Sequence, residues 1–241
     1  MKHLFCCFAE PTENDLWKIE PEDVHHLHSV LRHKVGDEVL FMDGKGVKGQ
    51  GSLAALDHRQ GLIKPTHIEK NEPQKYPVAL ILGALKPKVL DELLPTLNEL
   101  GVDCIIAYRQ KHSPKSAFEP KVMQRWLKIL QSSSKQCKRS YVPQIWGIDR
   151  IEEIRERLGS ESLGNRYLLQ EDAPVALLDA PLRTAPVVIG LGSESGMPPD
   201  ETDFFKELGF QPAHLGPNVL RAVTAATAAL TVVSLKRSAF L

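Results

Sequence analysis

The sequence has few cysteines, and their arrangement argues against a common kind of metal site. The four cysteines among the 241 residues are Cys6, Cys7, Cys104 and Cys137. They form no C-x-x-C pair and have no nearby histidine at the spacing of a structural zinc site. We therefore predict no metal site and expect these thiols to be buried or inert.

Long apolar runs are absent as well. No stretch approaches the roughly 18 to 20 apolar residues that a membrane-spanning helix requires. The apolar run within residues 1–8 is too short for a signal peptide. Because 42% of the residues are hydrophobic and 25% are charged, disordered and fibrous proteins are excluded too. We expect a cytoplasmic globular protein with one large domain or two small ones.

The net charge is zero, but basic residues are concentrated in one part of the chain. Between Arg109 and Arg150 there are ten basic residues and only two acids. This local excess is typical of a surface that contacts nucleic-acid phosphates. A solvated helix face is the alternative, since Lys121, Arg125 and Lys128 share i, i+4, i+7 spacing.

Residues 1–72 predict a small β-rich domain. Short apolar runs are separated by glycines, and the Asp43-Gly44 pair between two of them is typical of a hairpin turn. A helix is expected from Pro21 to Arg32, with acids at its N-terminal end. The polar segment 71–77 contains two prolines, so it is the best linker candidate. A second domain is therefore expected at 73–241.

Strands alternate with helices after this linker, which predicts an α/β domain with a parallel sheet covered by helices. The strands are expected at 78–82, 102–107, 167–169, 187–189 and 213–215. The helices are expected at 89–100, 121–136 and 151–158, after Pro198, and at 222–237.

Two glycine-rich turns follow strands of this second domain. The apolar run 187–189 continues directly into the first turn, and the second turn surrounds Gly216. Such junctions bring bare backbone N–H and C=O groups to one sheet edge, where open α/β folds bind ligands. Gly190, Gly192 and Gly196 miss the dinucleotide pattern G-x-G-x-x-G by one residue, and no acid ends the next strand. A nicotinamide cofactor is therefore not expected.

Both turns resemble the cofactor site of the SPOUT methyltransferases, and in particular of the RsmE-type enzymes that methylate N3 of a uridine in 16S ribosomal RNA. Those proteins carry Ile-Gly-x-Glu-Gly-Gly, followed by Leu-Gly-x-x-x-Leu-Arg-x-Glu-Thr-Ala. This chain has the similar segments 189–196 and 215–225. The resemblance extends over nearly the whole length, through His28, Leu31-Arg32, Val35-Gly36-Asp37, Asp43-Gly44, Glu99-Leu100-Gly101-Val102 and 135–143.

Some positions depart from the family pattern. Ser195 stands where the second glycine of Glu-Gly-Gly is usual, and Val223 replaces the acid after Leu-Arg. Lys135, Lys138 and Ser140 replace a Glu, a Gly and an Asn. A Cβ at position 195 disfavours a backbone with positive φ. The departures leave two alternatives open, a catalytically weakened RNA-binding relative and an enzyme that acts on another RNA such as transfer RNA.

The resemblance implies a SPOUT-type parallel sheet with a C-terminal trefoil knot, preceded by a small PUA-like, β-barrel-like domain. It also implies S-adenosylmethionine as cofactor, with no metal. Because the sulfonium already activates the methyl group, catalysis needs mainly alignment and removal of the uridine N3 proton. The implied cofactor-binding residues are Leu169, Gly190, Leu191, Gly192, Ser195, Gly196, Leu215, Gly216 and Leu220.

Arg221 is the expected catalytic residue, since a guanidinium before the last helix can orient the uridine or stabilise its developing negative charge. The alternative is a structural one, a carbonyl cap or an ion pair with Glu194. The expected RNA-binding residues are Arg32, Lys135, Lys138 and Arg139. The family further implies 16S ribosomal RNA or the small ribosomal subunit as partner, and a homodimer that packs through the last helix.

Overall fold

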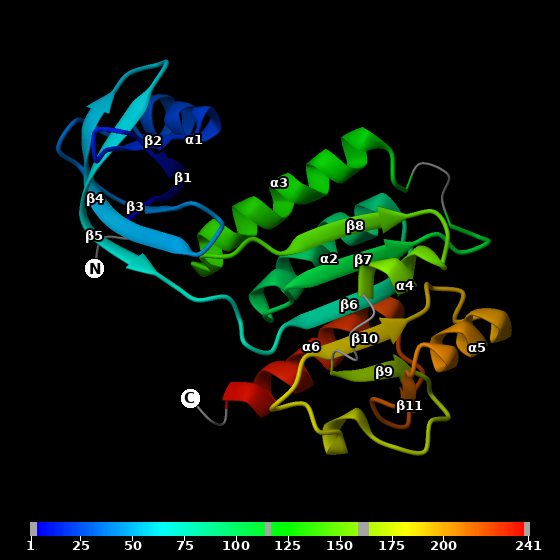
Figure 1. The fold of residues 1–241 in the computed structure, drawn as a ribbon. Coiled ribbons are helices and arrows are strands. Elements are labelled where there is room, and N and C mark those ends of the chain that lie inside the picture. The colour runs from blue at the N-terminus through cyan, green and yellow to red at the C-terminus, as the bar shows by residue number, and fades with distance from the viewer. Residues whose placement is uncertain (1–3, 114–116, 159–163, 239–241) are drawn as a thin grey trace. The chain divides into compact units, whose positions relative to one another are not determined.

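The computed structural model describes residues 4–113, 117–158 and 164–238 (Figure 1). The chain forms two compact units. The first unit contains the residues up to Pro73 together with Gln131–Val142, and the second contains Gln74–Leu130 and Pro143–Leu241. The expected boundary at residues 72 and 73 follows chain order, whereas the first unit also takes up a segment from the middle of the chain.

The first unit is built on a closed five-stranded barrel in the order β1-β2-β5-β4-β3. Parallel pairing of β1 with β3 closes it, and the remaining pairs are antiparallel. Closure leaves no free strand edge, so the expected β-barrel-like domain is confirmed. The strands are β1 (Cys6–Pro11), β2 (Trp17–Ile19), β3 (Glu38–Met42), β4 (Val47–Leu56) and β5 (Gly61–Lys70).

The turn between β3 and β4 lies where the Asp43-Gly44 pair predicts it. The Asp43 carboxylate accepts hydrogen bonds from the N–H groups of Lys45 (2.7 Å) and Val47 (2.9 Å). Gly44 has φ +73° and Gly46 φ +120°, which are conformations that favour glycine. The chemistry of the turn residues is therefore sufficient to place this hairpin.

The helix expected from Pro21 to Arg32 is shorter and changes type. It forms α1 (Pro21–His25) and continues as the π-helical turn η1 (His26–Val30). Arg32 has φ +56°, and the N–H of His33 reaches back to the C=O of Leu27 at 3.0 Å. This is the closing pattern of a helix end that normally uses glycine, so the helix stops before Arg32.

Segment 131–142 belongs to the first unit because of contacts between residues far apart in sequence. The N–H of Gly46 donates to the C=O of Ser140 (3.0 Å), and the N–H of Val142 donates to the C=O of Gly44 (3.1 Å). The Tyr141 hydroxyl donates to the C=O of Asn71 at 3.1 Å. Helix α3 (Pro120–Cys137) therefore begins in the second unit and ends in the first.

The second unit is a six-stranded sheet in the order β11-β9-β10-β6-β7-β8 (Figure 1). Every neighbouring pair is parallel, which confirms the expected α/β architecture. Its strands are β6 (Val78–Gly83), β7 (Cys104–Tyr108), β8 (Gln144–Ile148), β9 (Asn165–Leu169), β10 (Val187–Leu191) and β11 (Gln211–Ala213). In addition to the first part of α3, its helices are α2 (Pro87–Glu99), α4 (Glu153–Leu158), α5 (Pro199–Glu207), α6 (Ala222–Ser238) and the 3-10 turn η2 (Leu177–Asp179).

Helices cover both faces of this sheet. One face carries a core of Ile81, Ile106 and Val188 against Ile154 of α4 and Phe205 of α5. Figure 1 shows α2 and α6 behind the sheet, where they pack against each other and α6 packs against β10. All five residues of β10 are buried, as expected for a central strand of a covered parallel sheet.

Two strand predictions need correction. β8 was not predicted, because its sequence Gln-Ile-Trp-Gly-Ile lacks a strong apolar run and only Ile148 in it is fully buried, at the edge of the sheet. The last strand was expected at 213–215 but spans Gln211–Ala213. Leu215 therefore lies in the turn after the strand, beyond the carboxyl end of β11.

The thiols are buried or half-buried, as expected. Cys6 and Cys7 are buried, and Cys104 and Cys137 are half-buried and unpaired. Burial raises the pKa of Cys6 and that of Cys104 to about 11, so both stay protonated and unreactive near neutral pH. Within the described ranges, no three His, Cys, Asp or Glu side chains gather as metal ligands would. None of the described helices has the length and apolar character needed to cross a bilayer.

Candidate active site

The strand order brings three loops to one edge of the sheet. β9, β10 and β11 are neighbours and parallel, so the segments after their carboxyl ends meet, as in other open α/β sheets. These segments are 170–172 after β9, the β10 turn (192–197) and the β11 turn (214–221). They enclose a cavity of about 390 Å³, a size typical of small-molecule sites.

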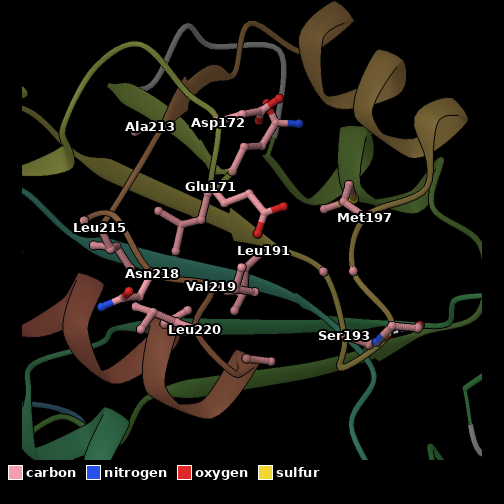
Figure 2. Close-up of a pocket in the computed structure, with 18 residues that line it drawn as sticks. Glu171, Asp172, Leu191, Ser193, Met197, Ala213, Leu215, Asn218, Val219 and Leu220 are labelled. Atoms are coloured by element: carbon pink, nitrogen blue, oxygen red, sulfur yellow. Dashed lines mark hydrogen bonds between the residues drawn. The ribbon is translucent and has the colours of Figure 1, made fainter.

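The cavity lining contains eight of the nine residues predicted to bind the cofactor (Figure 2). Gly190 is the exception, because it lies inside β10 and a Cβ there would face Leu168 and Phe210 of the core at 3.1 and 3.3 Å. The complete lining is Leu169, Gln170, Glu171, Asp172, Leu191, Gly192, Ser193, Ser195, Gly196, Met197, Ala213, Leu215, Gly216, Asn218, Val219, Leu220, Ala222 and Ala225.

Two acids in this lining were not predicted. Glu171 and Asp172 follow Leu169 at the end of β9, and Figure 2 shows the Glu171 carboxylate directed into the cavity near Leu191. The rule that loops after parallel strands bind ligands would have selected them, because Leu169 was already selected. Their carboxylates supply negative charge and hydrogen-bond acceptors to a cavity whose other polar side chains, Gln170, Ser193, Ser195 and Asn218, are neutral.

The β10 turn is compact and needs glycine at two positions. Gly196 has φ +84°, and its N–H donates to the C=O of Ser193 at 3.0 Å. A Cβ on Gly192 would lie 2.4 Å from the carbonyl oxygen of Gly196, which is backbone and cannot move aside cheaply. Ser195 is not among the residues with positive φ, so the expected conflict between its Cβ and the turn does not arise. The left-handed position is Gly196.

A buried amide holds the β10 turn from outside. Gln110, only 5% exposed, follows β7. Its Oε1 accepts a hydrogen bond from the N–H of Ser193 (2.9 Å), and its Nε2 donates to Oε2 of Glu201 on α5 (2.5 Å). The Tyr108 hydroxyl donates to the same Glu201 oxygen at 2.7 Å. Burial, and next the hydrogen bond to Glu201, raise the pKa of Tyr108 well above its usual range, so this donor keeps its proton.

The β11 turn is held by its own residues and by the chain after β9. His214 exchanges backbone hydrogen bonds with Val175 and Leu177, each 2.9 Å long. The Nδ1 atom of His214 accepts a hydrogen bond from the N–H of Gly216 at 3.1 Å, and Gly216 has φ +133°. No side chain from β7 or α5 is hydrogen-bonded to this turn among the described contacts, and Val219 is 80% exposed.

Arg221 lies at the end of the β11 turn, immediately before α6. It is exposed and is not part of the cavity lining, although Leu220 and Ala222 on either side of it are. Among the described residues its guanidinium makes no hydrogen bond or ion pair, and Glu194 forms no ion pair either. The structural alternative for Arg221, a link to Glu194, is therefore not formed in this structure.

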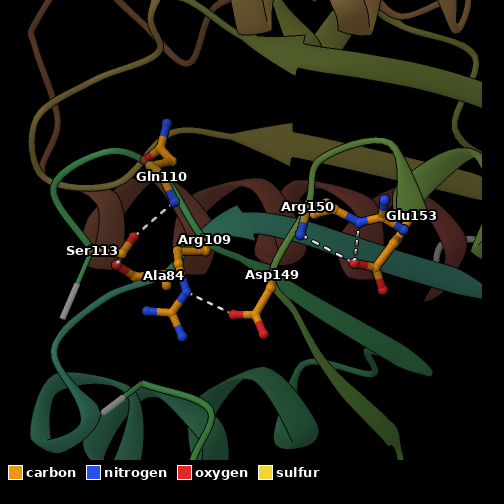
Figure 3. A network of polar contacts seen from close by, with 7 residues as sticks. All are labelled: Ala84, Arg109, Gln110, Ser113, Asp149, Arg150 and Glu153. Atoms are coloured by element: carbon orange, nitrogen blue, oxygen red, sulfur yellow. Dashed lines mark hydrogen bonds and ion pairs between the residues drawn. The ribbon is translucent and has the colours of Figure 1, made fainter. Parts of the chain in front are cut away.

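The basic stretch is more strongly paired than its sequence suggests. Arg125 contacts Asp91 of α2 at 3.0 Å, Arg109 contacts Asp149 at 2.6 Å, and Arg150 contacts Glu153 at 3.6 Å. Figure 3 shows the last two pairs. Asp91 and Glu153 lie outside the stretch, so folding supplies acids that chain order hides. Lys115 lies outside the described residues.

The four predicted RNA-binding residues all belong to the first unit, but they have different surroundings. The ammonium of Lys135 contacts the buried carboxylate of Asp23 at 2.5 Å, and the other oxygen of Asp23 accepts the N–H of Phe8 at 2.7 Å. Lys135 therefore fixes the end of α3 to the barrel. Arg32 and Lys138 are exposed, with φ +56° and +59°.

The backbone conformation of Lys138 explains why the family that this chain resembles usually has a glycine at this position. The helix α3 ends at Cys137, and the N–H of Arg139 reaches the C=O of Ser134 at 3.0 Å. This pattern puts residue 138 in the left-handed position that glycine adopts without strain. A lysine there costs roughly 1 kcal/mol, so this chain keeps a charge at a position where a glycine would be more stable.

Comparison with known protein families supports the same reading of the fold. The family model for the RNA methyltransferase domain matches residues 71–234, and the model for the RNA methyltransferase PUA domain matches residues 19–66. This chain belongs to the RNA methyltransferase family.

Relatives of this RNA methyltransferase carry a common name. The ribosomal RNA small subunit methyltransferase E of Synechocystis is 28% identical over 216 residues, which are 88% of this chain and 70% of the relative. The protein of the same name from Bacillus subtilis is 23% identical and covers 92% of this chain and 91% of its own.

Solved structures share the fold over almost the whole length. The ribosomal RNA small subunit methyltransferase E of Neisseria gonorrhoeae, solved bound to S-adenosyl methionine, has a TM-score of 0.84 and 24% identity, and the match covers 98% of each chain. A probable rRNA-methyltransferase from Porphyromonas gingivalis has a TM-score of 0.83 and 21% identity, with 99% of this chain and 100% of that chain covered. The SPOUT-type parallel sheet and the PUA-like barrel are therefore the fold of this RNA methyltransferase.

Proposed function

We propose that this RNA methyltransferase uses S-adenosylmethionine to methylate N3 of a uridine in 16S ribosomal RNA. The observation that carries the proposal is the cavity of about 390 Å³ formed by three loops at the carboxyl ends of β9, β10 and β11. In this proposal residues 1–72 form a PUA-like RNA-binding domain and residues 73–241 form the methyltransferase domain. The names of the relatives support the small-subunit RNA as substrate.

The cavity lining fits S-adenosylmethionine in shape and charge. Leucines supply apolar walls, and the β10 turn brings main-chain N–H and C=O groups within reach of an adenine edge. The carboxylates of Glu171 and Asp172 are acceptors for ribose hydroxyls or for the ammonium, and they balance the positive charge of the sulfonium. When bound, the cofactor supplies an activated methyl group. A C-terminal trefoil knot around this site remains a prediction.

Arg221 is the residue that we propose stabilises the substrate. Its guanidinium is exposed beside two residues of the cavity lining and makes no described ion pair. As N3 loses its proton, negative charge develops on the flanking uridine oxygens, and a guanidinium close to them stabilises that charge.

Binding and product analysis test the proposal in two separate steps. Calorimetry with S-adenosylmethionine is expected to show one site per chain with a dissociation constant in the micromolar range. An absence of binding up to millimolar cofactor contradicts the enzyme proposal and favours the weakened RNA-binding relative. Mass spectrometry of 16S ribosomal RNA from a deletion strain is expected to show loss of N3-methyluridine. If the level of N3-methyluridine is unchanged, the proposed substrate is wrong, and transfer RNA from the same strain is analysed next.

We also propose that Arg32, Lys138 and Arg139 contact RNA phosphates, whereas Lys135 positions the end of α3. The variant Lys138→Gly separates charge from backbone conformation, because glycine relieves the left-handed strain. It is expected to raise the melting temperature, while it weakens RNA binding and lowers the slope of log affinity against log salt by about 1. Lys206→Ala on α5 is the matched control. An unchanged salt slope in Lys138→Gly contradicts this surface.

A homodimer that packs through α6 is proposed from the family resemblance and from Val219 and Leu235, which are 80% and 64% exposed. Isologous contacts would cover both apolar side chains. Sedimentation equilibrium of the full chain is expected to give twice the chain mass of 26.9 kDa. A monomer at micromolar concentration contradicts the proposal.

A further inference from the structure

A second, smaller cavity adjoins the β10 turn. Its volume is about 150 Å³, and its lining consists of Ala84, Leu85, Lys86, His112, Ser193, Glu194 and Ser195. Ser193 and Ser195 also line the larger cavity. The two cavities therefore adjoin each other at the β10 turn.

The smaller cavity is built at the same sheet edge as the larger one. Its lining comes from the segments after β6, β7 and β10, which are neighbours in the order β10-β6-β7. The larger cavity uses the segments after β9, β10 and β11. Since Ser193 and Ser195 line both cavities, a molecule bound in one would lie close to a molecule bound in the other.

The turn that carries His112 is hydrogen-bonded to both neighbouring loops, and Figure 3 shows the hydrogen bond within the turn between Gln110 and Ser113. The N–H of Gln110 donates to Oγ of Ser113 and the N–H of Ser113 donates to the C=O of Gln110, both at 2.9 Å. The Ser113 hydroxyl reaches the C=O of Ala84 at 3.5 Å, and the Gln110 amide holds Ser193. The position of His112 relative to the β10 turn is thus set by hydrogen bonds on both sides.

We propose that the smaller cavity receives the target uracil ring and that the His112 imidazole accepts its N3 proton. This inference rests on the proposed function. In the step, the N3–H bond breaks and its proton goes to an imidazole nitrogen, while the N3 lone pair forms the bond to the methyl carbon. The carbon–sulfur bond breaks at the same time, its electron pair goes to sulfur, and the sulfonium becomes a neutral thioether.

The other polar side chains in the cavity suit different roles. Lys86 carries an ammonium, which has three donors and no lone pair, so it can bind a uracil oxygen but cannot take the proton. Glu194 offers a carboxylate, which is a weaker base than imidazole. Among the residues that line the two cavities, His112 is the one imidazole, and imidazole is the usual general base near neutral pH.

The charged groups around His112 come from each loop packed against its turn. Lys86 faces it from the segment after β6, Glu194 faces it from the β10 turn, and Lys111 adjoins it on its own turn. Of these groups, Lys86 lines the cavity and can bind a uracil oxygen through its ammonium, and Glu194 lines it with a carboxylate.

The test compares His112→Ala with His58→Ala, an exposed histidine outside both cavities. Loss of a general base is expected to lower kcat by about 10² to 10⁴, with the affinity for S-adenosylmethionine unchanged. The rise of kcat with pH through the imidazole range is expected to disappear in His112→Ala, and added free imidazole is expected to restore part of the rate. The control variant is expected to match the wild type.

Three outcomes overturn the inference. If His112→Ala keeps the wild-type kcat, or only raises the KM for RNA, His112 does not accept the proton. If Glu194→Gln loses turnover while His112→Ala retains it, the carboxylate is the acceptor instead. If the wild type binds the cofactor but methylates no uridine, the proposed function is wrong and this inference is wrong with it. If the wild type methylates uridine and His112→Ala does so equally well, only this inference is wrong.

Discussion

The two glycine-rich turns that line the proposed cofactor cavity look alike in sequence but are stabilised in different ways. The β10 turn is held by Gln110, a buried side chain from another strand, which also contacts Glu201 of α5. The β11 turn is held by its own His214 and by backbone pairing with the chain after β9. The first is a preformed wall, and the second presents exposed groups, Val219 and Arg221, to the solvent.

This difference assigns the turns separate tasks. A wall built on buried polar contacts loses stability when one of them is removed, because the partner groups remain buried and unpaired. A turn held by local contacts can present a charged group to a large substrate without such a cost. We therefore expect changes in the β10 turn to affect cofactor binding and stability, and changes in the β11 turn to affect turnover.

Among changes in the two turns and their supports, the largest effect is expected for Arg221→Ala. Loss of a group that stabilises developing negative charge typically lowers kcat by about 10² to 10³, while the cofactor cavity stays intact because Arg221 does not line it. Steady-state kinetics and calorimetry measure the two quantities separately. Arg59→Ala on the exposed turn between β4 and β5 is the control. If Arg221→Ala methylates normally, or if it loses cofactor binding instead, the proposal that the β11 turn serves turnover and the β10 turn serves cofactor binding is wrong.

Alanine at Gly192 and at Gly216 compares the two turns directly. In Gly192→Ala the new Cβ lies 2.4 Å from the Gly196 oxygen and 2.8 Å from the Met197 nitrogen, an overpacking that costs about 1–3 kcal/mol. Cofactor affinity is expected to fall by roughly 10- to 100-fold in consequence. At Gly216 nothing lies within 4 Å of the new Cβ, so only the φ of +133° opposes it.

Calorimetry and thermal unfolding of both variants test this prediction. Gly216→Ala is expected to lower stability while retaining more cofactor affinity than Gly192→Ala. The reverse order would show that the β11 turn, and not the β10 turn, is the rigid wall.

A smaller effect is expected for Gln110→Ala. The variant leaves the Ser193 N–H without its acceptor and removes one of the two donors to the Glu201 carboxylate, which keeps its hydrogen bond from Tyr108. Loss of such a buried partner costs about 1–3 kcal/mol. The melting temperature is expected to fall by a few degrees, since about 1 kcal/mol corresponds to roughly 2–4 °C in a chain of this size. Gln124→Ala on the exposed face of α3 is the matched control. Equal melting temperatures in the two variants would mean that Gln110 does not hold the turn.

The smallest effect is expected for Ser195→Gly, which restores the glycine of the family pattern. Ser195 is exposed and does not have positive φ, so no strain is relieved. The change loses only the contact between the hydroxyls of Ser193 and Ser195 at 3.0 Å, and stability is expected to stay within about 0.5 kcal/mol. A large gain in cofactor affinity would mean that the serine weakens the site after all.

Much of the fold and of the cofactor cavity could be predicted because it follows from contiguous residues. The apolar run before Gly190 predicts β10, and the Asp43-Gly44 pair predicts a hairpin that the structure contains. The ends of β9, β10 and β11 are recognisable as a ligand-binding edge, which is why Leu169 and most of the two turns were selected together. The helix end at Arg32 could not be predicted in this way, because a left-handed arginine replaces the expected glycine signal.

The contacts that complete the site join residues far apart in the chain. Gln110 and Ser193 are 83 residues apart, and Lys135 and Asp23 are 112 residues apart. No local pattern of polarity or spacing reveals such a pair, because each partner alone resembles an ordinary surface residue. For the same reason the basic stretch looked unpaired until folding brought Asp91 and Asp23 to it.

The sequence by itself determined a β-rich first domain with a hairpin at Asp43-Gly44, the alternation of the second unit and the glycine turns, since these depend on apolar periodicity and on backbone conformations that few residues adopt. The tertiary structure decided which turn is rigid, which lysine is structural, and which histidine lies beside the cofactor cavity. Those outcomes depend on strand order in the sheet, which brings loops from distant parts of the chain within hydrogen-bonding distance at a single edge.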